Sequence, residues 1–261
     1  MAPQTKPNAQ DTPVSVSNPT LGFQTTRLSF KPLRLSDTVA LHELRTEPEV
    51  MKWSVQKGPD ADLKQTEDWV KRSIGLDDAN SSSSSHPEGS GSTIAITRSK
   101  SKKKGLVFSV RELSYLNSQD VEGQAEKEDR IIAVVGIKES ESPVSGKMQY
   151  ELGYMFVPGV WGKGYASEAV KGILGWWFEY LGSFDTSIAM SGATSASGVV
   201  DGGEGDIEDK DGVYAIVAKT NGASIRVMEK CGLRVVGQNQ DADDRGLELV
   251  EFCISKSDLV S

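Results

Sequence analysis

The chain has 261 residues, a formal net charge of −8, 37% hydrophobic residues, two cysteines and two histidines. This length and apolar content support one substantial core, and the acidic balance argues against a general nucleic-acid binder, which would carry a basic face. Two cysteines make neither a disulfide framework nor a zinc site, and the two histidines have no metal-ligand spacing, so we expect no metal.

Residues 1–21 are polar and proline-rich, which is typical of a disordered tail. They lack the basic and apolar regions of a signal peptide. No run in the chain approaches 18 apolar residues, so the sequence predicts no membrane-spanning segment. Free thiols without a secretion signal favour a reducing compartment, and we therefore expect a cytoplasmic protein.

Alternating apolar residues predict a strand over 26–33, after which Ser36 or Asp37 can cap a helix that ends before Pro48. Apolar residues at helical spacing predict a second helix over 62–76. Three consecutive strands are then predicted from β-branched and alternating segments, at 106–112, 130–140 and 147–157.

The strongest helix pattern covers 166–181, where eight apolar residues follow a helical period. A strand over 213–218 is followed by a helix that Asn221 can cap and that Gly232 can end in the left-handed conformation. Two closing strands are predicted at 233–238 and 247–255. Polar, low-complexity stretches indicate insertions near 80–104, 114–129 and 190–212, so we expect one domain over 22–258.

The segment WGKGYASEAV (161–170) joins a predicted strand to the strongest helix. Exposed backbone N–H groups at a helix N-terminus bind pyrophosphate, and glycines allow its close approach. The GxG pattern, with Asp185 about 20 residues later, also fits a dinucleotide site, but three strands without intervening helices precede the loop. The loop alone leaves a plain β–α turn open, and the sequence has no Walker A motif and no GxSxG motif.

A second segment, NGASIRVMEKCGL (221–233), decides between these alternatives. Together with VPGVWGKGYASEAV (157–170) it resembles the GCN5-related N-acetyltransferases, the GNAT superfamily, and more narrowly their RimJ/RimL-like branch. The opening TTRLSFKPLRLSDTVALHELRTEPEVMKWS (25–54) is similar to that branch's first strand and helix. The resemblance covers about 25–255 apart from the insertions. It implies an α+β fold with a central mixed, mostly antiparallel sheet of six to seven strands and about four helices.

The resemblance also implies acetyl-CoA as the co-substrate and assigns its contacts. The pyrophosphate contacts fall on the loop and the first helical turn, namely Gly162, Lys163, Gly164, Tyr165, Ala166 and Ser167. The pantetheine would contact the backbone of Phe156 and Val157 and the side chain of Asn221, and an amide near Met155 would polarise the thioester carbonyl. Gly153 is interpreted as a bulge that opens the sheet.

The catalytic residues are less well defined. The resemblance places Ser224 near the coenzyme sulfur, whereas the tyrosine that many members carry seven residues after the asparagine is here Met228, expected in the core. A protonated alkyl amine needs a base, for which Glu151 is the first candidate. Glu248 and Glu251 are the alternatives, although any of these glutamates can equally be a solvated strand residue.

The sequence therefore predicts an acetyl-CoA-dependent N-acetyltransferase that acts on a primary amine, either a protein N-terminus or a small amine. Direct attack in a ternary complex is expected, because Cys231 reads as a small buried core residue. A non-catalytic acyl-CoA-binding module is the alternative, and a dehydrogenase is disfavoured by the missing βαβ repeats. The sequence indicates neither the acceptor nor the oligomeric state.

Overall fold

The computed structural model describes residues 22–56, 58–76, 106–113, 130–190, 212–239 and 246–259, and only the backbone for 183–190. The predicted tail over 1–21 and nearly all of the three predicted insertions lie outside the described residues. Among the described helices, none is both long and apolar enough to cross a bilayer.

An eight-stranded sheet forms the centre of the fold, in the order β1-β2-β3-β4-β5-β6-β8-β7. All neighbouring strands are antiparallel except β5 and β6, which run parallel. The strands are β1 (Phe23–Gln24), β2 (Leu28–Pro32), β3 (Leu106–Glu112), β4 (Ile131–Glu141), β5 (Met148–Phe156), β6 (Gly212–Ala218), β7 (Arg234–Gln238) and β8 (Leu249–Ser255). The mixed, mostly antiparallel sheet expected from the resemblance is confirmed, with one strand more than predicted.

The additional strand is β1, which pairs with β2 across a turn at Thr25. In that turn the Thr25 N–H donates to the Leu28 carbonyl at 2.9 Å. The Phe23 ring stacks on Phe30 with the ring centroids 4.1 Å apart. Two residues are too few to show an alternating pattern, so the sequence could not reveal this strand.

Within the described residues, five α-helices flank the sheet: α1 (Thr38–Thr46), α2 (Pro48–Met51), α3 (Leu63–Ile74), α5 (Tyr165–Met190) and α6 (Gly222–Lys230). The predicted end of α6 is confirmed, because Gly232 has φ +85°. Asp37 precedes α1, but its carboxylate accepts the Arg34 N–H instead of capping α1. Helix α5 continues through Gly182 to Met190, beyond the predicted end at 181, and no proline interrupts it.

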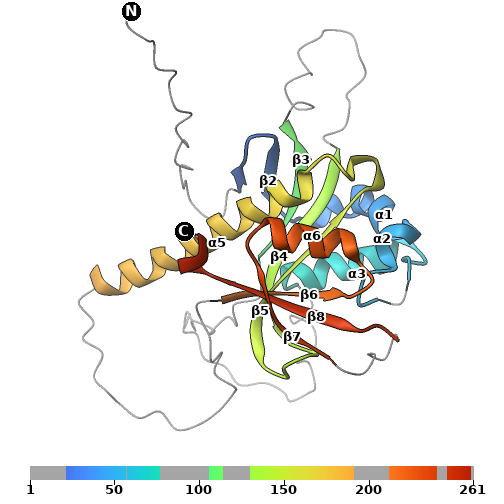
Figure 1. Ribbon diagram of the computed structural model, residues 1–261. Helices are drawn as coiled ribbons and strands as arrows, with labels where there is room; N and C mark the ends of the chain where they lie inside the picture. The colour runs from blue at the N-terminus through green and yellow to red at the C-terminus, as the bar shows by residue number, and fades with distance from the viewer. Residues whose placement is uncertain are drawn as a thin grey trace, which may run out of the picture.

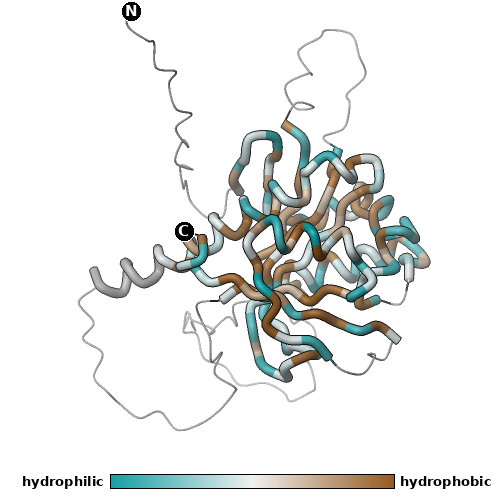
Figure 2. The backbone as a smooth tube through the Cα atoms, viewed as in Figure 1, coloured by the Kyte–Doolittle hydropathy of each residue, from teal (hydrophilic) through white to brown (hydrophobic). Residues whose placement is uncertain are grey.

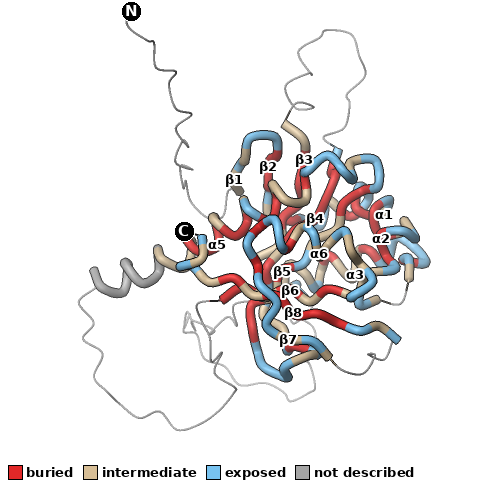
Figure 3. The backbone as a smooth tube through the Cα atoms, viewed as in Figure 1, coloured by how far each residue is buried: buried red, intermediate tan, exposed pale blue. Residues whose placement is uncertain are grey.

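The helices cover both faces of the sheet, with α5 and α6 on one face and α1 to α3 on the other (Figure 1). Trp176 of α5 packs edge-on against Phe108 with ring centroids 5.0 Å apart, while α1 and α3 contact β4 and β3. Hydrophobic residues follow the central strands (Figure 2), and these segments are also the buried ones (Figure 3). The core therefore lies in two layers, one on each side of the sheet.

The sheet opens between β5 and β6. Pairing there is limited to Tyr150 with Val213 and Glu151 with Tyr214, although both strands continue past this point. The prediction of a bulge at Gly153 is wrong, because this residue lies opposite Gly136 in regular register with β4. The opening follows instead from the early end of the β5–β6 pairing, which leaves one backbone edge of each strand unpaired.

Candidate active site

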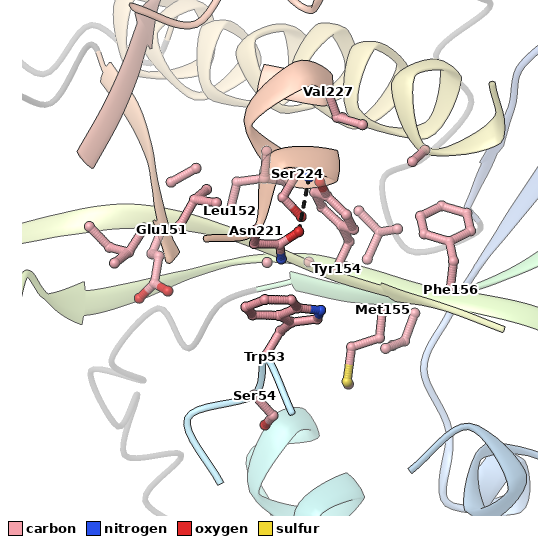
Figure 4. Close-up of a pocket in the computed structure, with 18 of the residues that line it drawn as sticks. Trp53, Ser54, Glu151, Leu152, Tyr154, Met155, Phe156, Asn221, Ser224 and Val227 are labelled. Carbon is pink, nitrogen blue, oxygen red and sulfur yellow. Dashed lines mark hydrogen bonds between the residues drawn. The ribbon is translucent and has the colours of Figure 1, made fainter. Parts of the chain in front are cut away.

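A cavity of about 1690 Å³ occupies this opening and extends to both faces of the sheet. Its walls are the diverging halves of β5 and β6, the loop that precedes α5, the first turns of α6, and the segment that follows α2. Figure 4 shows Glu151 and Trp53 on one side of β5, and Tyr154 and Ser224 on the other. A ligand in the cavity can therefore contact groups from both sides of the sheet.

The loop before α5 presents unpaired backbone amides to the cavity. Gly162 and Gly164 have φ of +76° and +81°, a conformation that side-chain-bearing residues rarely adopt. The helical hydrogen bonds begin with Glu168 N–H donating to the Gly164 carbonyl at 3.1 Å, so residues 164–167 keep N–H groups without helical acceptors. All four of these residues line the cavity, whereas Lys163 is exposed and does not. The arrangement suits an anionic ligand at the positive end of a helix.

Arg27 and Glu168 fasten this loop to the start of β2. Arg27 Nε lies 2.6 Å from Glu168 Oε2, and its Nη1 donates to the Lys163 carbonyl at 3.1 Å. Burial alone would raise the pKa of Glu168, but hydrogen bonds from Thr25 and Arg27 outweigh it and lower the pKa. Sequence reasoning missed this clamp, because its partners are 141 positions apart in the chain.

The backbone N–H and C=O groups of β5 that point toward the opening belong to other residues than those predicted from the sequence. Val157 N–H donates to the Ile132 carbonyl at 2.9 Å, so this amide belongs to the β4 side. The N–H and C=O groups of successive strand residues point to opposite edges. The backbone groups of Met155 therefore also point to β4, while those of Tyr154 and Phe156 point to the opening. The predicted coenzyme contacts of Val157 and Met155 stay predictions, and the backbone direction of these two residues does not favour them. Phe156 keeps its predicted place.

The Phe156 carbonyl already has a partner. Trp161, at the start of the loop, donates its Nε1 hydrogen to this carbonyl at 2.8 Å. This bond fixes the loop relative to the end of β5, and it gives the tryptophan at this position a structural role. No local sequence pattern indicated this role for Trp161.

Asn221 and Ser224 lie together at the start of α6 on the cavity wall. Asn221 Oδ1 accepts the Ser224 N–H at 3.2 Å, which is the helix cap predicted from the sequence. The Asn221 amide nitrogen makes no hydrogen bond to the described residues, and the Ser224 hydroxyl lies next to the Tyr154 side chain. Both groups can therefore serve a ligand. Met228, one helical turn further on, is fully buried as expected.

The three candidate glutamates lie in different environments. Glu151 lines the cavity, and its carboxylate has no hydrogen bond or ion pair with the described residues. Glu251 is buried and accepts from the Ser142 hydroxyl at 2.5 Å, and Glu248 pairs with Lys219 at 2.6 Å outside the cavity. Glu151 is therefore the only one of the three that a ligand in the cavity can reach.

Two further groups of lining residues were missed by sequence reasoning. Arg226 and Lys230 are exposed side chains four residues apart on α6, and both border the cavity. This i, i+4 spacing of basic residues was a usable signal for an anion site next to the loop. Trp53, which follows α2, and Trp69, on α3, line the opposite side of the cavity, and no local pattern indicated that position.

The remaining reactive side chains are engaged elsewhere. Burial raises the pKa of the Cys231 thiol to about 11, which disfavours the nucleophilic thiolate. His42 Nδ1 lies 2.8 Å from Thr66 Oγ1, away from the cavity lining. In the described parts of the chain, no group of three or more His, Cys, Asp or Glu side chains could hold a metal ion.

The model of the family described as "Acetyltransferase (GNAT) domain" matches residues 27–234. The chain belongs to this family. Its members use acetyl-CoA to acetylate their substrates. No curated protein matches the chain.

Solved structures share the GNAT fold. A GNAT-family acetyltransferase from Bacillus anthracis is 19% identical, with a TM-score of 0.56 over 91% of this chain and 99% of its own. Spermidine N-acetyltransferase from Vibrio cholerae, in complex with CoA and spermine, is 14% identical, with a TM-score of 0.55 over 91% and 100%. A probable GNAT acetyltransferase from Chromobacterium violaceum is 14% identical, with a TM-score of 0.57 over 100% and 98%. At these identities, the likeness concerns the fold alone.

Proposed function

We propose that the protein is an acetyl-CoA-dependent N-acetyltransferase of the RimJ/RimL-like branch that acts on a primary amine. The observation that carries this proposal is the opening between β5 and β6, which joins a loop of free amides to the unpaired edge of β5. The opening is reached from the opposite face by Glu151. One cavity thus offers a place for an anionic coenzyme and a separate side for an acceptor.

The coenzyme contacts follow from the groups that face the cavity. The amides of residues 164–167 hold the pyrophosphate, with Arg226 and Lys230 supplying positive charge nearby. The backbone of Tyr154 and Phe156 pairs with the pantetheine as an added strand would. The N–H that polarises the thioester carbonyl then comes from one of these two residues, in place of Met155.

The chemistry divides between the two faces. On the side of Trp53, Glu151 accepts the proton of the amine, directly or through a water molecule, and frees its lone pair for attack on the carbonyl carbon. On the side of α6, the Ser224 hydroxyl donates a hydrogen bond to the sulfur as the C–S bond breaks. The attack is direct, because the Cys231 thiol is buried and lies outside this path.

Replacing Glu151 with glutamine is expected to lower kcat/KM for the amine by about 100-fold to 10,000-fold, the usual contribution of a general base. The affinity for acetyl-CoA should stay unchanged, since this side chain lies on the other face of β5. Steady-state kinetics and calorimetry measure the two quantities. The control is Glu248→Gln, which removes a carboxylate outside the cavity and should leave the rate unchanged. A rate within threefold of wild type in Glu151→Gln would exclude Glu151 as the base.

The proposal is tested by measuring the release of free CoA when the protein is incubated with acetyl-CoA and each member of a panel of amines. The panel contains small amines, a polyamine such as the spermidine named for the Vibrio cholerae protein, and peptides with free N-termini. We expect amine-dependent release of CoA and acetylation of the amine, detected by mass spectrometry. Binding of acetyl-CoA without release for any amine would favour a non-catalytic acyl-CoA-binding module instead.

A further inference from the structure

Tyr154 carries a buried hydroxyl for which the proposed mechanism has so far no use. Its ring rises from β5 toward α6, and its Oη is shielded from solvent without a hydrogen-bond partner among the described residues. A buried hydroxyl left unpaired costs about 1–3 kcal/mol, so an unpaired one in a native fold requires an explanation. The residue also lines the cavity.

The nearest group able to change this is the Ser224 hydroxyl. The two side chains lie side by side under the first turn of α6 (Figure 4). Burial raises the pKa of Tyr154 to about 12, and the nearby Ser224 side chain opposes this only in part. The phenol therefore keeps its proton at neutral pH and acts as a hydrogen-bond donor. The Tyr154 hydroxyl, however, has no hydrogen bond of normal geometry to the described residues, although Ser224 lies within its reach.

We propose that Tyr154 is a positioning residue that donates a hydrogen bond to Ser224 Oγ and so directs the Ser224 O–H at the departing sulfur. This inference rests on the proposed function. Ser224 has one proton to donate, and without a donor of its own it can turn that proton toward any nearby carbonyl. A bond from Tyr154 occupies its acceptor side and leaves the proton for the cavity.

The hydrogen bond from Tyr154 does not alter which bonds form and break in the reaction. The N–C bond forms and the C–S bond breaks, the amine proton passes to Glu151 or to water, and the thiolate leaves with the bonding electron pair. Ser224 stabilises the sulfur's negative charge by its hydrogen bond, and Tyr154 keeps its own proton throughout. Hydrogen bonds to charged groups are stronger than those between neutral groups, so the alignment matters most as the thiolate forms.

The neighbouring residues offer no substitute for this donor. Met228 lacks a polar hydrogen, and the buried Cys231 thiol is a weak donor. Asn221 lies on the other side of Ser224 and already accepts its backbone N–H. Tyr154 is thus the strong donor on this side of Ser224 among the described residues that line the cavity.

The test is Tyr154→Phe, which removes only the hydroxyl. We expect kcat to fall about 10-fold to 100-fold, because Ser224 then loses the alignment of its hydrogen bond to the charged sulfur, while KM and Kd for acetyl-CoA stay within twofold. The melting temperature should stay the same or rise, because an unpaired buried hydroxyl is removed. A merely structural tyrosine would show the reverse pattern, with lower stability and unchanged kcat.

A double-variant cycle isolates the link to Ser224. If Tyr154 acts through Ser224, then Tyr154→Phe combined with Ser224→Ala should be no slower than Ser224→Ala alone. The matched control is Tyr150→Phe, which removes a hydroxyl from the same strand and face, about 13 Å away by strand geometry, and should keep wild-type kcat.

Three results would overturn the inference. An unchanged kcat in Tyr154→Phe, losses that multiply in the double variant, or loss of acetyl-CoA binding in Tyr154→Phe would each contradict it. These outcomes differ from failure of the proposed function, in which wild-type protein itself releases no CoA with any amine.

Discussion

Replacing Gly164 with glutamate should raise the Kd for acetyl-CoA at least about 100-fold, equivalent to ~2.7 kcal/mol. Gly164 has φ +81°, which strains any residue with a side chain, and its N–H is the first of the free amides before α5. The position itself has room, since the nearest atom to an added Cβ would be Arg27 Nη2 at 3.6 Å. The loss therefore comes from the shifted amides and from a negative charge beside the pyrophosphate.

Two controls separate these causes in a calorimetric titration. Gly164→Ala keeps the backbone strain without the charge and should cause a smaller loss of affinity. Gly159→Glu adds the same charge in the preceding turn, where φ is not positive and nothing lies within 4 Å of an added Cβ. That variant should bind acetyl-CoA as wild type does. Unchanged affinity in Gly164→Glu would remove the loop from the coenzyme site.

Replacing Asp60 with asparagine should lower the free energy of unfolding by about 3–5 kcal/mol, the usual effect of breaking a buried ion pair. Arg45 and Asp60 are 1% and 0% exposed at their side chains, and Arg45 binds both carboxylate oxygens, at 2.7 and 2.9 Å. Gln56 and Thr66 donate further hydrogen bonds to Asp60. Asparagine would leave the Arg45 charge buried without a counter-ion.

The penalty should depend on pH. Burial alone would raise the pKa of Asp60, but the hydrogen bonds from Arg45, Thr66 and Gln56 outweigh it and hold the pKa below its ordinary value. The stabilisation is therefore fully present above the ordinary carboxyl pKa of about 4 and is lost as the pH falls through the lower folded-state value. Urea unfolding of Asp60→Asn and wild type should differ most at neutral pH and converge in acid.

The control for this pair is Asp68→Asn, which breaks an exposed ion pair with Lys64 on α3. It should leave the urea midpoint unchanged, because exposed pairs contribute little. An equal effect of both substitutions would contradict the role assigned to burial. Because Gln56 lines the cavity and bonds to Asp60, we also expect Asp60→Asn to weaken the acceptor side of the site.

Local signals predicted most of the elements. Asn221 and Gly232 marked the two ends of α6, and Pro48 marked the end of α1, because capping and proline geometry act within a few residues. The two-residue β1 and the one-turn α2, which begins at Pro48, are too short to carry a period. The end of α5 was missed for a different reason, since Gly182 follows the last apolar position as a usual stop signal but does not end this helix.

The site was predicted less completely than the fold. The loop glycines and Asn221 came from motifs, but the choice between Met155 and Tyr154 depends on which edge of β5 remains unpaired. Which edge remains unpaired depends on where β6 pairs with β5, and β6 lies about 60 residues later in the chain. The Arg45–Asp60 pair likewise has no sequence period, because tertiary packing brings these two residues together.

The most direct test of the account is a crystal structure of the protein with CoA bound. We expect the pyrophosphate on the amides of residues 164–167 and the pantetheine alongside Tyr154 and Phe156. The sulfur should lie within hydrogen-bond reach of the Ser224 hydroxyl, whose Oγ then accepts from Tyr154. CoA bound outside the opening between β5 and β6, or a sulfur beyond the reach of Ser224, would contradict the account.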